Sequence, residues 1–305
     1  MINSYCKYFS ADKLFPLFLL LLFGFSGFAQ QAQDHVRVVS ANIRVALKTD
    51  IEKGRGWDGR KELVFEVIRN QSPDIIGLQE VMEVQNEDFK KAFPDFFSFG
   101  FEGPEMDAFT DGEYHLIAKN PILFNTKKFD FISGGTYWLS ETPHLGGSMS
   151  WETARARHVN WVRLRDKSTG KVFRVLNTHF DHVSKEAKQK AAEMILEESD
   201  QYPENFPQIL MGDFNSDVTS SPIKTLRTQW NDSYSDLNND VDPGFTVHGF
   251  IGPEAKTKKG KVDFIFYRGP LQAIEASVMK DNRDGVYPSD HYFVSAALQL
   301  GEELN

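Results

Sequence analysis

Several apolar, strand-like runs of this chain end in a polar side chain suited to chemistry, and this pattern restricts the folds open to the chain most strongly. The run at 36–43, VRVVSANI, carries Asn42 near its end, and the run at 73–81, PDIIGLQEV, carries Glu80. Later runs carry the same kinds of group, namely Asn177 with His179, Asp213 with Asn215, Asp263, and Asp290 with His291. Burying separate amides and carboxylates costs several kcal/mol unless they satisfy one another or bind a ligand. The pattern therefore predicts that these runs converge at one rim.

Each of these polar groups also has an ordinary structural interpretation. Asn42 suits a turn, Glu80 a solvated strand end, and His179 a half-buried, hydrogen-bonded histidine. The pair at 290–291 follows Pro288, which by itself predicts a turn. A functional site is therefore indicated by the number of such groups on separate runs, and not by any one of them.

Hydrophobic periodicity predicts many strands and few helices. Helical spacing indicates a helix from Arg60 to Ile68 with Asp58 as its N-cap, a helix after an N-cap at Ser184, and a short helix around 222–230. Strands are expected near 36–43, 73–81, 114–124, 129–139, 157–166, 171–180, 207–214, 261–268, 271–279 and 291–300. The chain has no repeat or Pro/Ser linker after Gln30. We therefore expect one α/β domain of two packed sheets with helices outside.

The first residues have the pattern of a secretory signal peptide. Lys7 and Lys13 precede the apolar run Leu14–Phe28, and small residues occupy positions 27 and 29. The alternative, a retained membrane anchor, is weaker because a spanning helix needs roughly 20 apolar residues. We expect residues 1–29 to be removed and residues 30–305 to form the domain, without a stable membrane anchor. The protein would then be secreted or periplasmic, and it would lose its single cysteine, Cys6.

The net charge disfavours proteins that hold long polyanions. The chain carries −9, which becomes −10 without residues 1–29 because these contain two lysines and one aspartate. Non-specific nucleic-acid binding depends on many lysine and arginine contacts to phosphates. Nucleic acid is therefore the weaker alternative to a small substrate. We also expect the protein to be a monomer. The lysine-rich segment at 254–261 is either a solvated loop or a local patch that attracts a phosphorylated substrate.

The residue types at the predicted rim favour metal-assisted hydrolysis of a phosphoester. Carboxylate and amide oxygens suit a hard cation such as Mg²⁺, with Mn²⁺ as a second choice. The two histidines add proton transfer or hydrogen bonds to phosphate, and the sequence lacks the cysteine or paired-histidine spacing of a structural zinc site.

Six motifs together resemble the endonuclease/exonuclease/phosphatase superfamily, whose fold is that of DNase I. In order these are SANI, DIIGLQE, NTHFDH, MGDFNS, VDFIF and PSDH, and they extend over nearly all of 36–300. The segments GTYWLSETP at 135–143, SW at 150–151 and HGF at 248–250 resemble a secreted bacterial branch. The resemblance implies a four-layer sandwich of two packed, mostly antiparallel β-sheets flanked by helices.

The resemblance also implies roles for the rim residues. Asn42, Glu80 and Asp290 would form the metal environment, with Glu80 as a direct ligand. Asp213 would orient or deprotonate the attacking water, and Asn215 would hold that water or a phosphate oxygen. The remaining rim residues would contact the phosphate or support that contact, namely Asn177, His179, His291 and, by orienting His291, Asp263.

Four further residues are implied less directly. Glu113 would orient His179 and Tyr114 would donate to phosphate, or the two would be a turn residue and a core tyrosine. Arg157 would bind phosphate, or be a solvated strand arginine. Lys188 stands where the family has an arginine, and a lysine lacks the planar fork for a bidentate phosphate contact.

Two other functional classes remain beside the phosphoesterase. A non-catalytic binding protein on the same scaffold would not need the full polar set. A glycoside hydrolase needs two carboxylates, which the chain has, but this interpretation does not explain the histidines and asparagines at the strand ends. Among phosphoesterases, a secreted nuclease is the alternative to an enzyme for sugar, inositol or lipid phosphates.

Overall fold

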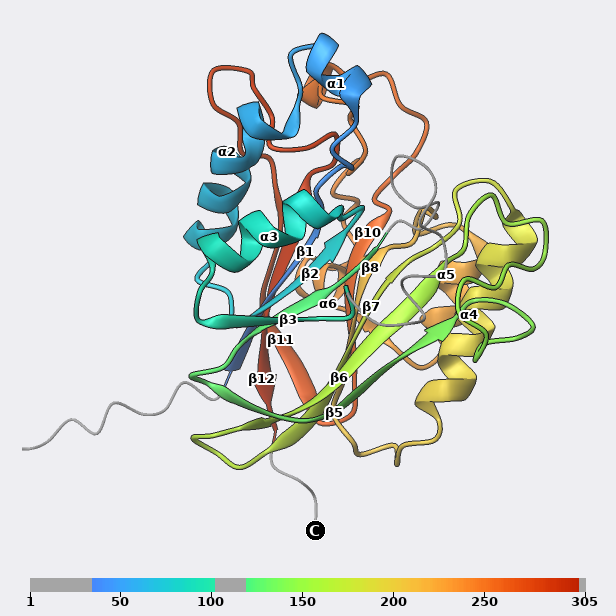
Figure 1. The fold of residues 1–305 in the computed structure, drawn as a ribbon. Helices are drawn as coiled ribbons and strands as arrows, with labels where there is room; N and C mark the ends of the chain where they lie inside the picture. Colours follow the sequence, from blue (N-terminus) through green and yellow to red (C-terminus); the bar gives the residue numbers. More distant parts are fainter. Residues whose placement is uncertain (1–34, 102–118, 302–305) are drawn as a thin grey trace, which may run out of the picture. The chain divides into compact units, whose positions relative to one another are not determined.

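The computed structural model describes residues 35–101 and 119–301, which lie within one compact unit (Figure 1). Two six-stranded sheets form its centre, with strand orders β11-β12-β1-β2-β4-β3 and β5-β6-β7-β8-β10-β9. The first sheet contains β1 (His35–Asn42), β2 (Ile75–Gln79), β3 (Phe96–Phe99), β4 (Ile122–Asn125), β11 (Leu271–Met279) and β12 (Phe293–Leu300). The second contains β5 (Phe129–Trp138), β6 (His158–Asp166), β7 (Val172–His179), β8 (Gln208–Asp213), β9 (Asn231–Asp232) and β10 (Asp263–Arg268).

Each sheet is mixed, with one parallel pair near its centre. β1 is parallel to β2 in the first sheet, and β7 is parallel to β8 in the second. The remaining pairs are antiparallel. Because parallel strands end at the same edge of a sheet, each sheet delivers the residues after two central strands to one edge.

Helices cover the outer faces of both sheets (Figure 1). The helices are α1 (Lys48–Glu52), α2 (Trp57–Asn70), α3 (Glu83–Ala92), α4 (Lys185–Ser199), α5 (Ser221–Leu226), α6 (Ser233–Leu237) and a 3₁₀ helix, Gly252–Glu254. α2 and α3 lie against the first sheet, and α4 and α5 lie beside each other against the second. The expected fold of two packed sheets flanked by helices is confirmed. Among the residues described, no helix is both long and apolar enough to cross a membrane.

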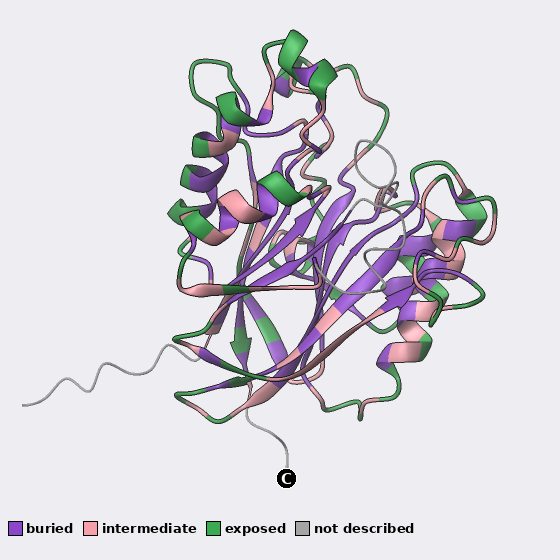
Figure 2. Cartoon of the chain, in the orientation of Figure 1, coloured by how far each residue is buried: buried purple, intermediate pink, exposed green. Residues whose placement is uncertain are grey.

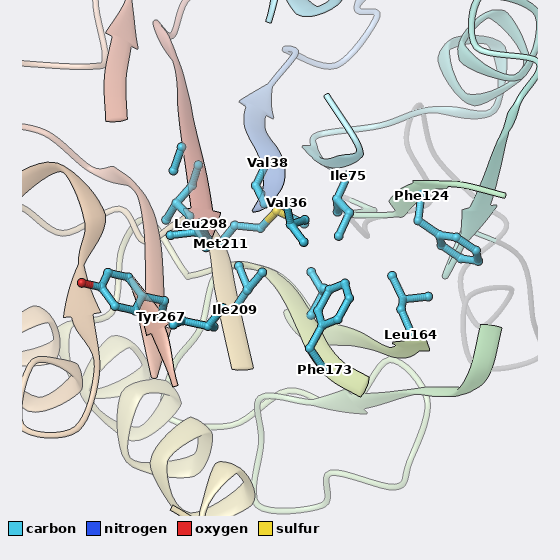
Figure 3. Packing of buried hydrophobic residues seen from close by; sticks show 14 of the residues in the cluster. Val36, Val38, Ile75, Phe124, Leu164, Phe173, Ile209, Met211, Tyr267 and Leu298 are labelled. Carbon is cyan, nitrogen blue, oxygen red and sulfur yellow. The ribbon is translucent and has the colours of Figure 1, made fainter. Parts of the chain in front are cut away.

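Strand alternation divides the buried side chains into three apolar layers. In β8, Ile209 and Met211 point between the two sheets, whereas Leu210 points toward α4 and α5. In β1, Val38 joins the layer between the sheets, and Val39 packs on the side of α2. Figure 3 shows this central layer and Figure 2 its burial. Each such side chain contributes about 1.5–3 kcal/mol on burial, so the sheets are held firmly against each other.

Two predicted helix starts have different outcomes. Ser184 is the N-cap of α4, where its side chain accepts a hydrogen bond from the backbone N–H of Ala187, as predicted. The prediction that Asp58 caps α2 is wrong, because the helix begins at Trp57 after Gly56. Asp58 lies in the first turn, exposed, and forms an ion pair with Lys61.

Gly212 allows β7 and β8 to approach each other next to the candidate site. Its φ is +153°, and a Cβ atom there would lie 2.1 Å from the carbonyl oxygen of Thr178. No side chain fits at that distance, so glycine is required immediately before Asp213.

Candidate active site

The register of the second sheet brings three polar side chains into one row. In the parallel pair of β7 and β8, His179 lies opposite Asp213. In the antiparallel pair of β8 and β10, Asp263 lies opposite Asp213 from the other side. Three residues distant in sequence therefore meet at one edge because strand pairing places them there.

The first sheet supplies the opposite side of the same edge. Asn42 pairs with Gln79 at the ends of β1 and β2, so Glu80 follows directly at the rim. The hydroxyl of Ser289 donates to the carbonyl oxygen of Asn42 over 2.6 Å, which anchors the segment carrying Asp290 and His291. The predicted convergence of the polar residues at one rim is observed.

Between these groups lies a cavity of about 290 Å³. Seven of the predicted site residues line it, namely Glu80, Arg157, His179, Asp213, Asn215, Asp290 and His291. The predicted residues therefore contribute three carboxylates, two histidines, a guanidinium and an amide to the lining of the cavity.

Asp213 is held rigidly at the centre of the site. Its Oδ2 accepts a hydrogen bond of 3.0 Å from the amide of Asn42 and lies 3.2 Å from Nε2 of His179. Its Oδ1 accepts from the backbone N–H of Asn215 over 2.9 Å. Burial acts to raise the pKa of Asp213, but the charges of His179 and His291 outweigh it and leave the pKa well below its usual range. Asp213 is therefore a fixed, ionised acceptor.

His291 forms a charged pair with the carboxylates around it. Its Nδ1 lies 3.0 Å from Oδ2 of Asp263, while Nε2 lies 3.9 Å from Oδ2 of Asp213. Burial acts to lower the pKa of His291, but Asp263 and Asp213 raise it to about 10. Near neutral pH the imidazole is therefore protonated, which makes it a donor for an anionic ligand.

The guanidinium of Arg157 is buried at the cavity without full compensation. Nη2 lies 3.3 Å from Nδ1 of His182. Nε and Nη1 are buried and have no hydrogen-bond partner among the described residues. Burial lowers the pKa of Arg157, although Glu80, Asp181 and Asp213 oppose that shift. Unpaired buried donors of this kind are costly, and because Arg157 lines the cavity, its positive charge would favour an anion there.

Glu80 and Asp290 form an acidic pair on the other side of the cavity. Glu80 accepts a hydrogen bond from the backbone N–H of Val45, and Asp290 lies 3.6 Å from the guanidinium of Arg44. Burial raises the pKa of Asp290, and the nearby charge of Glu80 raises it further against the opposing His291. Two carboxylates that repel each other suit a hard divalent cation, which would relieve the repulsion. The donor set therefore fits a metal here.

A second group also has the spacing of a metal site. Ligand atoms of Asp213, Asp263 and His291 all lie within 4.8 Å of one another, and all three residues are buried. The short contact between His291 and Asp263 instead uses one atom of each in a hydrogen bond. We therefore consider the Glu80 and Asp290 side the better place for the ion.

Backbone strain marks three of the cavity residues. Arg44, Glu80 and Asn215 have φ values of 60°, 62° and 45°. Residues other than glycine adopt this left-handed conformation at a cost of roughly 1–3 kcal/mol, and such residues gather at functional sites. Here the strain turns the chain sharply after β2 and after β8, so that Glu80 and Asn215 face the cavity.

Two predicted phosphate contacts lie elsewhere. The prediction for Asn177 is wrong, because its amide is fully buried between the sheets and donates to the carbonyl oxygens of Leu78, Asn120 and Pro121. Lys188, the other predicted phosphate contact, does not line the cavity. Its ammonium group donates to the carbonyl oxygen of Asn215.

Three other predicted site residues need separate comment. Asn42 is buried beside the site, where its Oδ1 accepts from the backbone N–H of Arg44 and its amide holds Asp213, so it positions a carboxylate and does not face the cavity. Glu113 and Tyr114 lie outside the described residues. Nδ1 of His179, which Glu113 is predicted to orient, is buried and has no partner among the residues described.

The sequence interpretation missed several basic residues around the cavity. Arg44, Arg155 and His182 line it. Arg60, assigned only to a helix, is buried and donates to the carbonyl oxygens of Ile43, Arg44 and Pro288. Two signals could have pointed to them: His182 ends the NTHFDH motif, and Arg44 lies two residues after Asn42.

Comparison with known proteins identifies the relatives of this arrangement. Residues 39–291, most of the chain, match the profile of the endonuclease/exonuclease/phosphatase family. The chain belongs to this family. The match extends from β1 to His291 and so includes every described residue of the candidate site.

Solved structures of the family support the same fold. A family protein from Bacteroides thetaiotaomicron is 28% identical, with a TM-score of 0.76 over 87% of this chain and 97% of that one. A mannosyl-6-phosphatase from the same organism is 28% identical, with a TM-score of 0.75 over 86% of this chain and 99% of that one. A relative identified by sequence alone, an uncharacterized protein of Acanthamoeba polyphaga mimivirus, is 27% identical over 71% of this chain and 80% of its own length. Family membership and these neighbours support a phosphoesterase.

Proposed function

We propose that this protein is an exported, metal-dependent phosphoesterase that hydrolyses a small phosphorylated molecule, such as a sugar, inositol or lipid phosphate. The observation that carries the proposal is that the guanidinium of Arg157 and the protonated His291 line the same cavity as the ionised Asp213. A phosphate in the cavity would meet the positive charges of Arg157 and His291.

The residues divide the chemistry between them. Arg157 and His291 would bind phosphoryl oxygens and stabilise the negative charge that develops there. The amide nitrogen of Asn215 contacts Nε2 of His179 and the carbonyl oxygen of Phe180, so Asn215 would act by holding this side of the site in place. Asp213, fixed by hydrogen bonds, would accept a hydrogen bond from the attacking water and aim it in line with the leaving oxygen. Its low pKa makes it better at orienting this water than at retaining a proton.

A divalent cation would be held by Glu80 and Asp290. When bound, Mg²⁺ or Mn²⁺ would supply Lewis-acid stabilisation of charge on the phosphate and the leaving oxygen. Arg44 and Arg60 would fix the two loops that present these carboxylates.

The proposal is tested by hydrolysis of bis-p-nitrophenyl phosphate and p-nitrophenyl phosphate. We expect EDTA to abolish activity and Mg²⁺ or Mn²⁺ to restore it after dialysis. Asp213→Asn and His291→Ala should lower kcat at least about a hundredfold, because water-orienting and acid-base groups contribute roughly 10²–10⁴. Asp130→Asn and His144→Ala, on exposed residues, serve as controls. Circular dichroism checks that the variants are folded.

Two results would contradict this function. Activity that survives chelation would show that hydrolysis does not depend on a metal. Activity of Asp213→Asn within threefold of the wild type would show that Asp213 has no part in the mechanism. Release of a nitrophenyl sugar without phosphate hydrolysis would instead indicate a glycoside hydrolase.

Export is a separate part of the proposal and rests on residues 1–29. We expect the protein recovered from the periplasm or medium of its host to begin at Gln30, as measured by intact mass. Recovery of the full-length chain from the cytoplasmic fraction alone would contradict export.

A further inference from the structure

A second cavity adjoins the candidate active site on the side of α4 and α5. Its volume is about 370 Å³. Three lysines line it, Lys185 and Lys188 from α4 and Lys259 from the loop before β10. We call this space the lysine cavity. It does not belong to the machinery described above, except that Asn215 borders both spaces.

The lysine cavity is electropositive. None of its three ammonium groups forms an ion pair within the described part of the chain, whereas many other lysines there do. Its one acidic lining residue, Asp217, already accepts hydrogen bonds from the backbone N–H and the hydroxyl of Thr219. Three lysines thus line the space against one engaged carboxylate, so an anion near it would be attracted.

The ammonium groups also influence one another. Burial lowers the pKa of Lys188, and the charges of Lys259 and Lys185 lower it further, although Asp181 and Asp213 oppose them. Like charges placed this close together repel, and a bound anion would remove that repulsion.

Asn215 forms the wall between the two cavities. Its side-chain amide lies 3.1 Å from Nε2 of His179 on the active-site side. Its carbonyl oxygen accepts from Nζ of Lys188 on the other side, over 3.2 Å. Asn215 is thus the one lining residue that the two cavities share.

We propose that the lysine cavity binds a second phosphate group of the substrate, one that is not cleaved, while the scissile phosphate lies in the candidate active site. This proposal rests on the proposed function and narrows its substrate class to molecules with two phosphates. Pro222 and Val262 line the same space and offer apolar contact to the carbon skeleton between them.

Bisphosphates of propanediol, pentanediol and heptanediol test this without assuming a natural substrate. Each is compared with the matching alkyl monophosphate. We expect KM for at least one bisphosphate to be about tenfold below that of its monophosphate, since two partly screened lysine contacts are worth about one order of magnitude. The double variant Lys185→Gln/Lys259→Gln should remove this advantage, leaving kcat and the monophosphate KM within twofold.

The matched control is Lys190→Gln/Lys224→Gln. These residues lie on α4 and α5, their loss changes the net charge by the same amount, and neither lines the cavity. Lys188 is left intact because it supports Asn215. If the two double variants change the KM advantage of the bisphosphate equally, the preference is due to overall charge and the proposal is overturned. The absence of a bisphosphate advantage at every spacing would also overturn it.

Free phosphate is the other source of the same chemistry. If inorganic phosphate alters monophosphate hydrolysis in the wild type but not in Lys185→Gln/Lys259→Gln, and no bisphosphate is preferred, the cavity binds a free anion and the substrate assignment is wrong.

Calorimetric binding in EDTA separates this proposal from the proposed function. If the wild type hydrolyses nothing but still binds a bisphosphate about tenfold more tightly than the monophosphate, and the lysine variant does not, the function fails while the second phosphate site stands. Equal binding of the two compounds would overturn the site in either case.

Discussion

His158 in β6 is a buried imidazole without polar partners. Its ring lies 5.0 Å from that of Trp138, and neither ring nitrogen has a hydrogen-bond partner among the described residues. Burial lowers the pKa of His158 to about 3, helped by the charges of Arg157 and Lys119. Folding therefore keeps this histidine neutral beside the arginine of the candidate site.

This residue should make stability depend on pH. With a folded pKa of about 3 against 6.5 in the unfolded chain, the unfolded state binds more protons between these values. Stability from His158 is thus complete above pH 6.5 and falls as the pH decreases, by about 1.4 kcal/mol per unit. His158→Leu, similar in volume, should flatten the free energy of unfolding between pH 6.5 and 4.5 in urea titrations.

The exposed His144→Leu is the control for this measurement. Wild type and His144→Leu should follow the same steep line. If His158→Leu follows it too, the buried imidazole does not control acid sensitivity.

At the residue scale, the sequence predicted which groups would matter better than what each would do. Asn42, Asn177 and Asn215 look alike in sequence, as amides near the ends of apolar strands. Sheet pairing determines their different roles. Asn215 faces the cavity, and the amide of Asn42 donates to Asp213. The amide of Asn177 instead donates to carbonyl oxygens between the sheets. Those partners come from distant strands, so local sequence does not reveal them.

At the scale of elements, the close contact of β7 with β8 determines the geometry of the site. Gly212 permits this contact, and its neighbour Asp213 lies opposite His179 because of it. Moving β8 away by even a few tenths of an ångström would lengthen the contacts of Asp213.

Gly212→Ala should therefore damage both stability and catalysis. The new methyl group would meet the carbonyl oxygen of Thr178, and the residue would need a φ that alanine rarely adopts. We expect the unfolding free energy to fall by at least about 2 kcal/mol. We also expect kcat to fall at a temperature where the variant is still fully folded, so that unfolding does not account for the lost activity. Thermal unfolding and hydrolysis of a nitrophenyl ester measure the two effects.

Gly59→Ala is the matched control, because its Cβ would meet nothing within 4 Å inside α2. It should be neutral or raise stability by roughly 0.5–1 kcal/mol. Wild-type stability in Gly212→Ala would show that the strands can separate without cost.

The elements that sequence analysis found are those with clear periodicity. The long strands have alternating apolar patterns and were predicted close to their bounds, and the helical pattern of α4 predicted that helix and its N-cap at Ser184. α3 was missed because its sequence, EVQNEDFKKA, buries only one large apolar side chain, Phe89. α1 and α6 have five residues each and depend on tertiary packing.

For the whole molecule, the net charge is negative, whereas basic residues gather at the rim and at the lysine cavity. The chain carries −9, yet the rim has Arg44, Arg155 and Arg157, and the lysine cavity lies beside it. A small anion meets this local field, whereas a long polyanion must also lie along the acidic surface.

Duplex DNA should therefore be a poor substrate. Near 150 mM salt, about physiological ionic strength, we expect kcat/KM on duplex DNA to be at least roughly tenfold below that on the best small phosphoester, because few phosphates would be neutralised. Steady-state rates on both substrates, repeated across salt concentrations, give the comparison. DNA as the best substrate would make the protein a nuclease.

The pairing of β1 with β12 has a consequence for the timing of synthesis. β1 is the first described strand, and one of its two neighbours is the last. Asp290 and His291 lie just before that final strand. A growing chain thus carries Glu80, His179 and Asp213 long before the segment that completes the rim has been translated. Phosphoester hydrolysis should consequently appear only after the segment from Asp290 to the end of β12 has been translated, and chains truncated before it should be inert.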